Sequence, residues 1–261
     1  MNLQKKVVLI TGASSGIGAA AAKAFANEGA IVILAARSKD NLTQIASQIT
    51  RTEKLIFPLD VTSYEQVQNM IAQVLSIFGK IDILVNNAGV GLSERIESMS
   101  LANFRKLLEI NVFAPTMLIQ TVLPAMRKAG SGKILNISSM ITSTISNGSG
   151  GYRASKLALN AISDATRHEL KHSNIRVVTI FPGATATGFY NNRIGVDSLN
   201  NETTQRVSGR SPEFVAQKIV EAAKKNNREV FMSLRGFIGS KVALMFPEIT
   251  DFIQSFRNKI R

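Results

Sequence analysis

Short apolar runs alternate with longer amphipathic stretches along most of the chain. Six of the runs are rich in β-branched residues and show little alternation of polar positions, which is typical of parallel strands buried on both faces. These runs are Val7–Ile10, Ile31–Leu34, Leu55–Leu59, Ile83–Val85, Ile134–Ile137 and Val177–Phe181. A weaker run at Glu229–Met232 predicts a last strand.

The stretches between these runs carry apolar residues at helical spacing. They predict helices over Gly16–Glu28, Lys39–Thr50, Tyr64–Phe78, Leu101–Lys128 and Tyr152–Lys171. Ser211 followed by Pro212 predicts the start of one more, because serine is a preferred cap and proline fits the first helical position. Regular alternation of strands and helices predicts an α/β fold, a Rossmann-type doubly wound parallel sheet of about seven strands with helices on both faces.

No repeat, low-complexity tract or linker interrupts this pattern, so residues 1–261 are predicted to form one domain. The polar, irregular segment 187–210 would border the crevice beyond the carboxyl ends of the strands, as a lid over a bound ligand. The tail 235–261 mixes apolar and basic residues and predicts a basic helix near Glu248–Arg261. We expect the tail to pack against the domain; the alternative is a helix on a membrane surface or over the substrate.

Composition narrows the classes of function. Hydrophobic residues make up 45% of the chain, enough for a large core, and 31 Lys and Arg against 18 Asp and Glu give a net charge of +13. The positive charges are scattered and match no nucleic-acid-binding motif, so we expect no nucleic-acid partner. With no cysteine, the chain has no disulfides or thiolate metal sites and is compatible with a reducing cytoplasm. The sequence contains no run of 18 apolar residues, so we expect no integral membrane segment. The apolar run after Lys6 is too short for a signal peptide.

A glycine-rich turn follows the first predicted strand. It reads Thr11-Gly12-Ala13-Ser14-Ser15-Gly16-Ile17-Gly18, a G-x-x-x-G-x-G spacing that departs from the G-x-G-x-x-G dinucleotide fingerprint. The physical reason for the glycines is shared, because they let the backbone approach a ligand and aim the N–H groups of the next helix at a phosphate. The turn therefore predicts a dinucleotide cradle.

The end of the second predicted strand bears on the choice of dinucleotide. A site for NAD places an Asp or Glu there to bind the ribose hydroxyls. Here the sequence is Leu34-Ala35-Ala36-Arg37-Ser38, with no acid. Arg37, helped by the Ser38 hydroxyl, could instead bind a 2′-phosphate, so NADP is predicted and NAD is the less favoured cofactor. The alternative for Arg37 is an ordinary solvated arginine.

Tyr152 and Lys156 are spaced i,i+4 on a predicted helix and so share one face. A tyrosine titrates near pH ~10, and an ammonium close to it would lower that value toward the range useful for acid–base catalysis. Such pairs also occur on solvated helix faces, where they have no catalytic role. The glycine-rich turn and Ser139, which ends the strand thirteen residues before Tyr152, favour the catalytic interpretation.

Together these motifs resemble the short-chain dehydrogenase/reductase family, over residues 5 to about 223. In the order of that family they are Thr11–Gly18, Asp60-Val61, Asn86-Asn87-Ala88-Gly89, Asn111, Ser139, Tyr152 with Lys156, and Pro182-Gly183 with Thr187. The resemblance implies hydride transfer between a nicotinamide and a carbonyl/alcohol pair. It departs from the family at the tail, which lacks the common Gly-Gly ending of the last strand, so the tetramer contact that this strand builds is in doubt.

The resemblance also implies a role for each matching residue. Tyr152 would exchange the substrate proton, Ser139 would hydrogen-bond the carbonyl oxygen, and Lys156 would hold the nicotinamide ribose and lower the Tyr152 pKa. Asn111 would anchor a water on the proton path. The implied cofactor-binding residues are Gly12, Ser14, Ser15, Gly16, Ile17, Gly18, Arg37, Ser38, Asp60, Val61, Asn87, Ala88, Gly89, Tyr152, Lys156, Pro182, Gly183, Thr185 and Thr187.

Two local patterns add to this picture. Pro115 stands four residues after Asn111, so it leaves the Asn111 carbonyl without its helical N–H partner and free to bind a water; the alternative is a plain helix kink. His168 and His172 are spaced i,i+4 but lie around the helix from Lys156, with no carboxylates to complete a ligand set. We expect a surface position for both histidines and no metal site.

The sequence thus predicts a cytoplasmic, NADP-dependent oxidoreductase that acts on a small carbonyl or alcohol substrate and forms a homodimer or homotetramer. Its substrate cannot be read from the chain. Within the enzyme class the alternative is a 3-oxoacyl carrier-protein reductase, because a basic surface could receive an acidic carrier protein. A second alternative is an NADP-binding regulator without catalytic activity.

Overall fold

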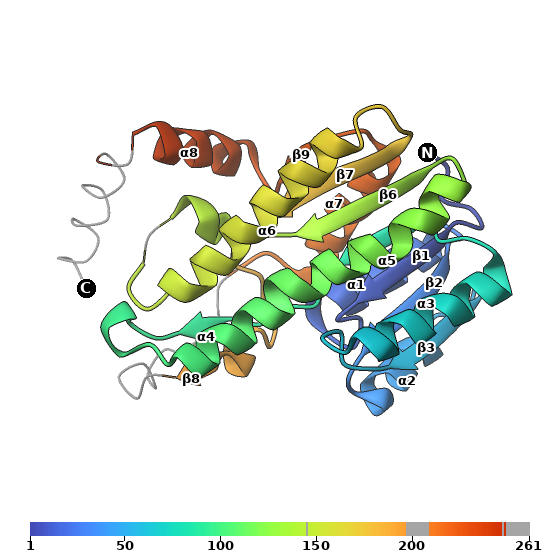
Figure 1. The fold of residues 1–261 in the computed structure, drawn as a ribbon, viewed down its shortest axis with the longest axis horizontal. Coiled ribbons are helices and arrows are strands. Elements are labelled where there is room, and N and C mark those ends of the chain that lie inside the picture. Colours follow the sequence, from blue (N-terminus) through green and yellow to red (C-terminus); the bar gives the residue numbers. More distant parts are fainter. Residues whose placement is uncertain (145, 197–208, 247, 249–261) are drawn as a thin grey trace.

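A seven-stranded parallel sheet forms the centre of the computed structural model, which describes residues 1–144, 146–196, 209–246 and 248 (Figure 1). Its strand order is β3-β2-β1-β4-β6-β7-β9, and each neighbouring pair is parallel. The strands are β1 (Val7–Thr11), β2 (Ile31–Ala36), β3 (Lys54–Pro58), β4 (Ile83–Asn86), β6 (Gly132–Ile137), β7 (Ile175–Phe181) and β9 (Glu229–Phe231). This confirms the predicted doubly wound sheet, with β3 displaced by one residue toward the N-terminus.

Helices cover both faces of the sheet (Figure 1). They are α1 (Gly16–Asn27), α2 (Lys39–Ser47), α3 (Tyr64–Phe78), α4 (Leu101–Leu108), α5 (Ala114–Lys128), α6 (Gly150–Glu169), α7 (Pro212–Lys224) and α8 (Leu234–Met245). Short 3-10 turns are η1 (Ile96–Ser98), η3 (Met140–Ser143) and η4 (Tyr190–Asn192). The predicted helix start at Ser211 is confirmed, since its hydroxyl accepts a hydrogen bond from the Phe214 N–H at 3.2 Å.

The two core layers explain why the strands lack polar alternation. Along β1, Val8 and Ile10 point into the cluster shared with α1, α2 and α7, whereas Val7 and Leu9 point into the cluster shared with α3 and α5. All four side chains are fully buried. A strand covered by helices on both faces needs apolar residues at odd and even positions alike, which is the pattern of its sequence.

The predicted long helix over 101–128 contains a π-helical turn, η2 (Glu109–Phe113), between α4 and α5. Here the Ala114 N–H donates to the Glu109 carbonyl, five residues back. The change of hydrogen-bond register is expected next to Pro115, which has no N–H to offer the Asn111 carbonyl. The sequence predicts an irregularity at this place but not its form.

By length and composition alone, this same stretch is the one helix in the described part of the chain that could cross a membrane. It is weak support for a span, because 44% of the apolar window is already buried within the protein. Buried helices that cover a sheet pass the same test.

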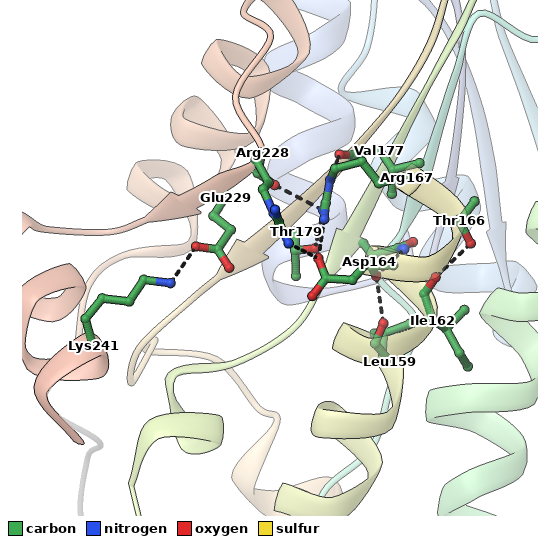
Figure 2. A network of polar contacts seen from close by, with 12 residues as sticks. Leu159, Ile162, Asp164, Thr166, Arg167, Val177, Thr179, Arg228, Glu229 and Lys241 are labelled. Atoms are coloured by element: carbon green, nitrogen blue, oxygen red, sulfur yellow. Dashed lines mark hydrogen bonds and ion pairs between the residues drawn. The ribbon is translucent and has the colours of Figure 1, made fainter. Parts of the chain in front are cut away.

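Two strands and one helix were not predicted. β5 (Leu92–Ser93) pairs in parallel with β8 (Ile194–Val196) in a small sheet of its own. Helix α8 packs against η3 and β9, and its Lys241 forms an ion pair of 2.9 Å with Glu229 of β9 (Figure 2). On its outer side Leu234 and Met245 are exposed. The expected tail helix over 248–261 falls almost entirely outside the described residues, as does the part of the predicted lid over 197–208.

A polar network fastens the edge of the sheet to α6 (Figure 2). Arg167 of α6 donates through Nε to the Val177 carbonyl at 2.9 Å and through Nη2 to the Thr179 hydroxyl at 3.1 Å. Its other terminal nitrogen pairs with Asp164, which also binds Arg228 at 3.0 Å. Arg167 therefore joins the helix to β7, and Arg228 extends the network to the start of β9.

Lys133 of β6 is buried, with 2% of its surface exposed, and its ammonium lies at the end of α7. It donates to the carbonyls of Ala223 at 2.7 Å and Lys225 at 2.5 Å. Burial lowers the pKa of Lys133, with a smaller effect of the Arg176 charge in the same direction. The buried cation thus serves carbonyls that the helix itself cannot satisfy.

Replacing Lys133 by methionine should therefore lower the free energy of unfolding by about 1–3 kcal/mol, because the carbonyls lose their donor. Urea unfolding of the two proteins measures this difference. Lys171→Met, at an exposed position, is the matched control and should change stability little. Equal stability of Lys133→Met and wild type would show that the buried ammonium is not needed at the end of α7.

Candidate active site

The glycine-rich turn joins β1 to α1 in close contact with the loop after β4. Gly12 has a φ of +64°, and a Cβ there would lie 2.9 Å from the Ala88 Cα. A Cβ on Gly18 would lie 2.2 Å from the Gly12 carbonyl oxygen. The Asn87 amide locks the two segments together by donating to the Thr11 and Gly12 carbonyls at 2.9 and 3.2 Å. Only glycine fits either position without moving the backbone.

The N-terminus of α1 faces a cavity of about 1140 Å³. Ser15 precedes the helix but its side chain makes no capping hydrogen bond, and the first turn holds no acid. The Gly16 and Ile17 N–H groups thus form a positive helix end beside the cavity. This end fits a pyrophosphate, the group that a dinucleotide would place there.

Arg37, Ser38 and Asp60 lie at one end of the same cavity, where β2 and β3 finish. The Ser38 hydroxyl caps α2, accepting from the Asn41 N–H at 3.3 Å. Burial raises the pKa of Asp60, but hydrogen bonds from Thr62 and the charges of Arg37 and Lys106 outweigh it and hold the pKa below its usual value. A guanidinium (Arg37) and a hydroxyl (Ser38) thus follow β2 directly, where the sequence carries no acid.

Tyr152 and Lys156 share the inner face of α6, as their spacing predicts. The Lys156 ammonium lies 5.9 Å from the centre of the Tyr152 ring and donates to the Ile137 carbonyl at 3.0 Å. Only 4% of Lys156 is exposed. Burial lowers the pKa of Lys156 to about 8, because the charged form loses its water.

The pKa of Tyr152 shifts in the direction opposite to our expectation. Burial raises it and the neighbouring Tyr190 raises it further, while a hydrogen bond with the Ser139 side chain lowers it less. Lys156 is not among the groups that move it. The expected lowering by Lys156 is therefore wrong for this structure: the phenolate loses more by leaving water than it gains from an ammonium that is engaged with Ile137.

Asn111, in the π turn, lies behind the cavity and is 1% exposed. Its amide exchanges two hydrogen bonds of 2.9 Å with the Val90 backbone and donates to the Ser155 hydroxyl at 3.0 Å. A Cβ on Gly89 would lie 3.1 Å from Asn111 Oδ1 and 3.4 Å from Lys156 Nζ. The side chain thus ties the loop after β4 to α6, close to the Lys156 ammonium.

The cavity gathers nearly every residue that the sequence singled out. The exceptions are Asn111 and Gly18, which stand behind its wall. Ser139, whose hydroxyl accepts from the Ile141 N–H at 3.2 Å, lines the cavity together with Tyr152. The predicted residues that line it are Gly12, Ser14, Ser15, Gly16, Ile17, Arg37, Ser38, Asp60, Val61, Asn87, Ala88, Gly89, Ser139, Tyr152, Lys156, Pro182, Gly183, Thr185 and Thr187.

Other lining residues were missed. Asn41, in the first turn of α2, also lines the cavity, and an asparagine four residues after Arg37 gives no chemical signal of its own. Gly91 borders the part near Tyr152, together with Phe189, Tyr190 and Arg193 of the predicted lid 187–210. The small β5–β8 sheet brings these segments together. These strands are too short for periodicity to reveal them. His168 and His172 are both exposed, as expected, and within the described ranges no three His, Cys, Asp or Glu gather as metal ligands.

Comparison of the sequence and the structure with known proteins identifies the family of this chain. The family model described as short chain dehydrogenase matches residues 6–194. An uncharacterised oxidoreductase of Staphylococcus saprophyticus subsp. saprophyticus is 36% identical over 190 residues, which cover 72% of this chain and 81% of the relative. A short-chain dehydrogenase from Streptomyces avermitilis superposes with a TM-score of 0.80 at 31% identity, covering 98% of this chain and 99% of the other.

A third similar protein carries a cofactor analogue. It is an alcohol dehydrogenase from the archaeon Thermococcus sibiricus complexed with 5-hydroxy-NADP, with a TM-score of 0.75 at 28% identity over 87% of this chain and 96% of the other. Other solved neighbours hold NADP or NADH. The matched region runs from β1 through the Tyr152–Lys156 pair to β8. The chain therefore belongs to the short-chain dehydrogenase family of oxidoreductases.

Proposed function

We propose that this chain is an NADP-dependent oxidoreductase that interconverts a small-molecule carbonyl and its alcohol. The observation that carries the proposal is a shared cavity: Tyr152, Ser139 and Lys156 line the same space as the glycine cradle and Arg37. When bound, the nicotinamide cofactor would supply or accept the hydride. The chain supplies the proton, the orientation and the exclusion of water.

In the direction of reduction, the Tyr152 hydroxyl would donate its proton to the substrate oxygen. Ser139 donates a second hydrogen bond to that oxygen, where negative charge develops. Lys156 holds the nicotinamide ribose, and Asn111 fixes the loop and helix around Lys156. The Asn111 carbonyl, beside the proline that cannot donate to it, is the proposed site of a water on the proton path.

In this proposal, different groups of residues bind different parts of the cofactor. Gly12, Ser14, Ser15, Gly16 and Ile17 bind the pyrophosphate, Gly18 lets α1 pack closely against the turn, and Asp60 and Val61 border the adenine. The nicotinamide end is held by Asn87, Ala88, Gly89, Pro182, Gly183 and Thr185, and Thr187 contacts the carboxamide or the pyrophosphate. Thr187 and the residues after it that border the cavity support the proposed lid over residues 187–210. We propose that this lid is part of a single domain. A homodimer or homotetramer in the cytoplasm stays a prediction.

Arg37 supports NADP over NAD. It stands at the end of β2 next to the N-terminus of α2, where a phosphate would meet both a guanidinium and free N–H groups. The acid at this end, Asp60, stands after β3 and binds Thr62 through its Oδ1, at 2.9 Å to the N–H and 2.8 Å to the hydroxyl. Asp60 therefore does not stand at the end of β2, where an NAD site places its acid.

The test is the ratio of kcat/KM for NADPH and NADH with a panel of ketones and aldehydes. We expect a preference for NADPH of at least about tenfold, and Arg37→Ala should reduce it by about tenfold through loss of the charged hydrogen bond. Arg51→Ala, at an exposed position away from the cavity, should leave the ratio unchanged. A preference of wild type for NADH would overturn the choice of cofactor.

A further inference from the structure

A line of aromatic side chains leads from Tyr152 to a guanidinium within the cavity. The Phe189 ring lies 5.7 Å from the Tyr152 ring, and the Tyr190 ring stands edge-on to Phe189 at 6.1 Å. The Arg193 guanidinium carbon lies 5.3 Å from the centre of the Tyr190 ring. All four side chains border the same space, so a substrate with its oxygen at Tyr152 can extend over Phe189 toward Arg193.

Arg193 is held in position by its surroundings. Its Nε donates to the Tyr190 carbonyl at 2.8 Å, and the next residue, Ile194, donates its N–H to the Gly91 carbonyl at 2.9 Å. A Cβ on Gly91 would lie 2.8 Å from the Arg193 Cγ, so glycine is what lets the arginine stem cross the end of β5. Within residues 1–144, 146–196, 209–246 and 248, the terminal nitrogens of this stacked guanidinium have no hydrogen-bond partner, and they can meet a planar group.

The neighbouring acid does not serve as that partner in this structure. Glu94, just after β5, accepts hydrogen bonds from the Ser100 N–H at 2.8 Å and the Asn103 amide at 2.7 Å, both at the start of α4. Among the described residues that line the cavity, the acids are Asp60 and Glu109. Asp60 feels the charges of Arg37 and Lys106, and Glu109 follows Lys106 by one helical turn. Both acids thus belong with the cations of the other end.

We propose that Arg193 binds a carboxylate on the substrate, and that the chain acts on oxo-acids or hydroxy-acids whose apolar, preferably aromatic, body packs on Phe189. The inference rests on the proposed function, whose proton donor is Tyr152. In this arrangement Tyr152 and Ser139 fix the reacting oxygen and Arg193 fixes the far end. Two fixed ends orient the carbonyl carbon, which raises the rate more than a single contact does.

The experiment compares aryl oxo-acids of increasing spacer length with their methyl esters, in NADPH-dependent reduction. The charged hydrogen bond should give the best acid a kcat/KM at least about tenfold above that of its ester. Arg193→Met should remove that preference, lowering kcat/KM for the acid about 10–100-fold and leaving the ester nearly unchanged. Arg193→Lys keeps the charge but not the fork and should fall between the two. Arg51→Met is the matched surface control.

A binding measurement separates this inference from the proposed function. Calorimetric titration with an unreactive aryl alkanoate and its amide should show binding of the carboxylate to wild type, about 10-fold weaker binding to Arg193→Met, and no difference for the amide. If this pattern holds but no carbonyl is turned over, the carboxylate site stands and the proposed function fails. The carboxylate site is refuted if wild type and Arg193→Met each reduce the acids and the esters at the same rate. It is also refuted if the alkanoate binds both proteins with the same affinity, as the amide is expected to do. Melting temperatures verify that Arg193→Met is folded.

Discussion

Tyr152→Phe should lose about 10²–10⁴-fold in turnover, because it removes the proposed proton donor to the substrate oxygen. The variant keeps the ring that packs against Phe189, so the shape of the cavity is preserved. Binding of NADPH should stay within about twofold of wild type, since the cradle is untouched. Stopped-flow or steady-state absorbance of the reduced nicotinamide gives the rate, and calorimetry gives the affinity.

The matched control is Tyr64→Phe. Tyr64 begins α3, is 60% exposed and does not line the cavity, so its hydroxyl should be dispensable for turnover. Turnover of Tyr152→Phe close to that of wild type would refute the assignment of the proton donor. A matching loss in both variants would point to general damage instead of a lost proton donor.

Lys156→Met should lose about 10²-fold or more in kcat/KM, because the nicotinamide ribose loses the ammonium proposed to hold it. The same substitution should also change how the free energy of unfolding depends on pH. The pKa of Lys156 is about 8 in the folded protein and near its ordinary value of 10.5 when unfolded. Between pH 8 and pH 10.5, Lys156 binds more protons in the unfolded chain than in the folded protein. The contribution of Lys156 to folding stability therefore rises with pH over this range.

The difference in unfolding free energy between wild type and Lys156→Met should accordingly shift in favour of wild type by roughly 2–3 kcal/mol from pH 8 to 10.5. Urea unfolding of the cofactor-free proteins across that range measures it. Lys133 also has a lowered pKa but is present in both proteins, so its effect cancels. A difference that does not change with pH would mean that Lys156 titrates normally in the fold.

The elements that sequence analysis finds are those with a strong local cause. The buried runs and the serine caps at Ser38, Ser63 and Ser211 carry their own signals, so strands and helix starts fall close to the predicted places. The pairing of β5 with β8 joins segments roughly a hundred residues apart and only two or three residues long. No local pattern contains such a contact.

The candidate site divides in the same way. Residues in ordered motifs, such as Gly12 and Gly16 of the glycine turn and Tyr152 with Lys156, line one cavity. Arg193 is in an irregular segment and becomes visible only when β8 places it beside Gly91. The raised pKa of Tyr152 is also a tertiary effect, because it depends on how much water the fold removes from the phenol.

Burial raises the pKa of Tyr152 in the structure described. For Tyr152 to act as the proposed proton donor, we expect its phenol to become more acidic when the cofactor is bound. Ultraviolet difference titration of the phenolate, wild type minus Tyr152→Phe, measures that pKa with and without NADP⁺. The positive charge of the oxidised nicotinamide should lower it by at least about one unit on cofactor binding. A Tyr152 pKa that stays the same or rises on cofactor binding would contradict the account.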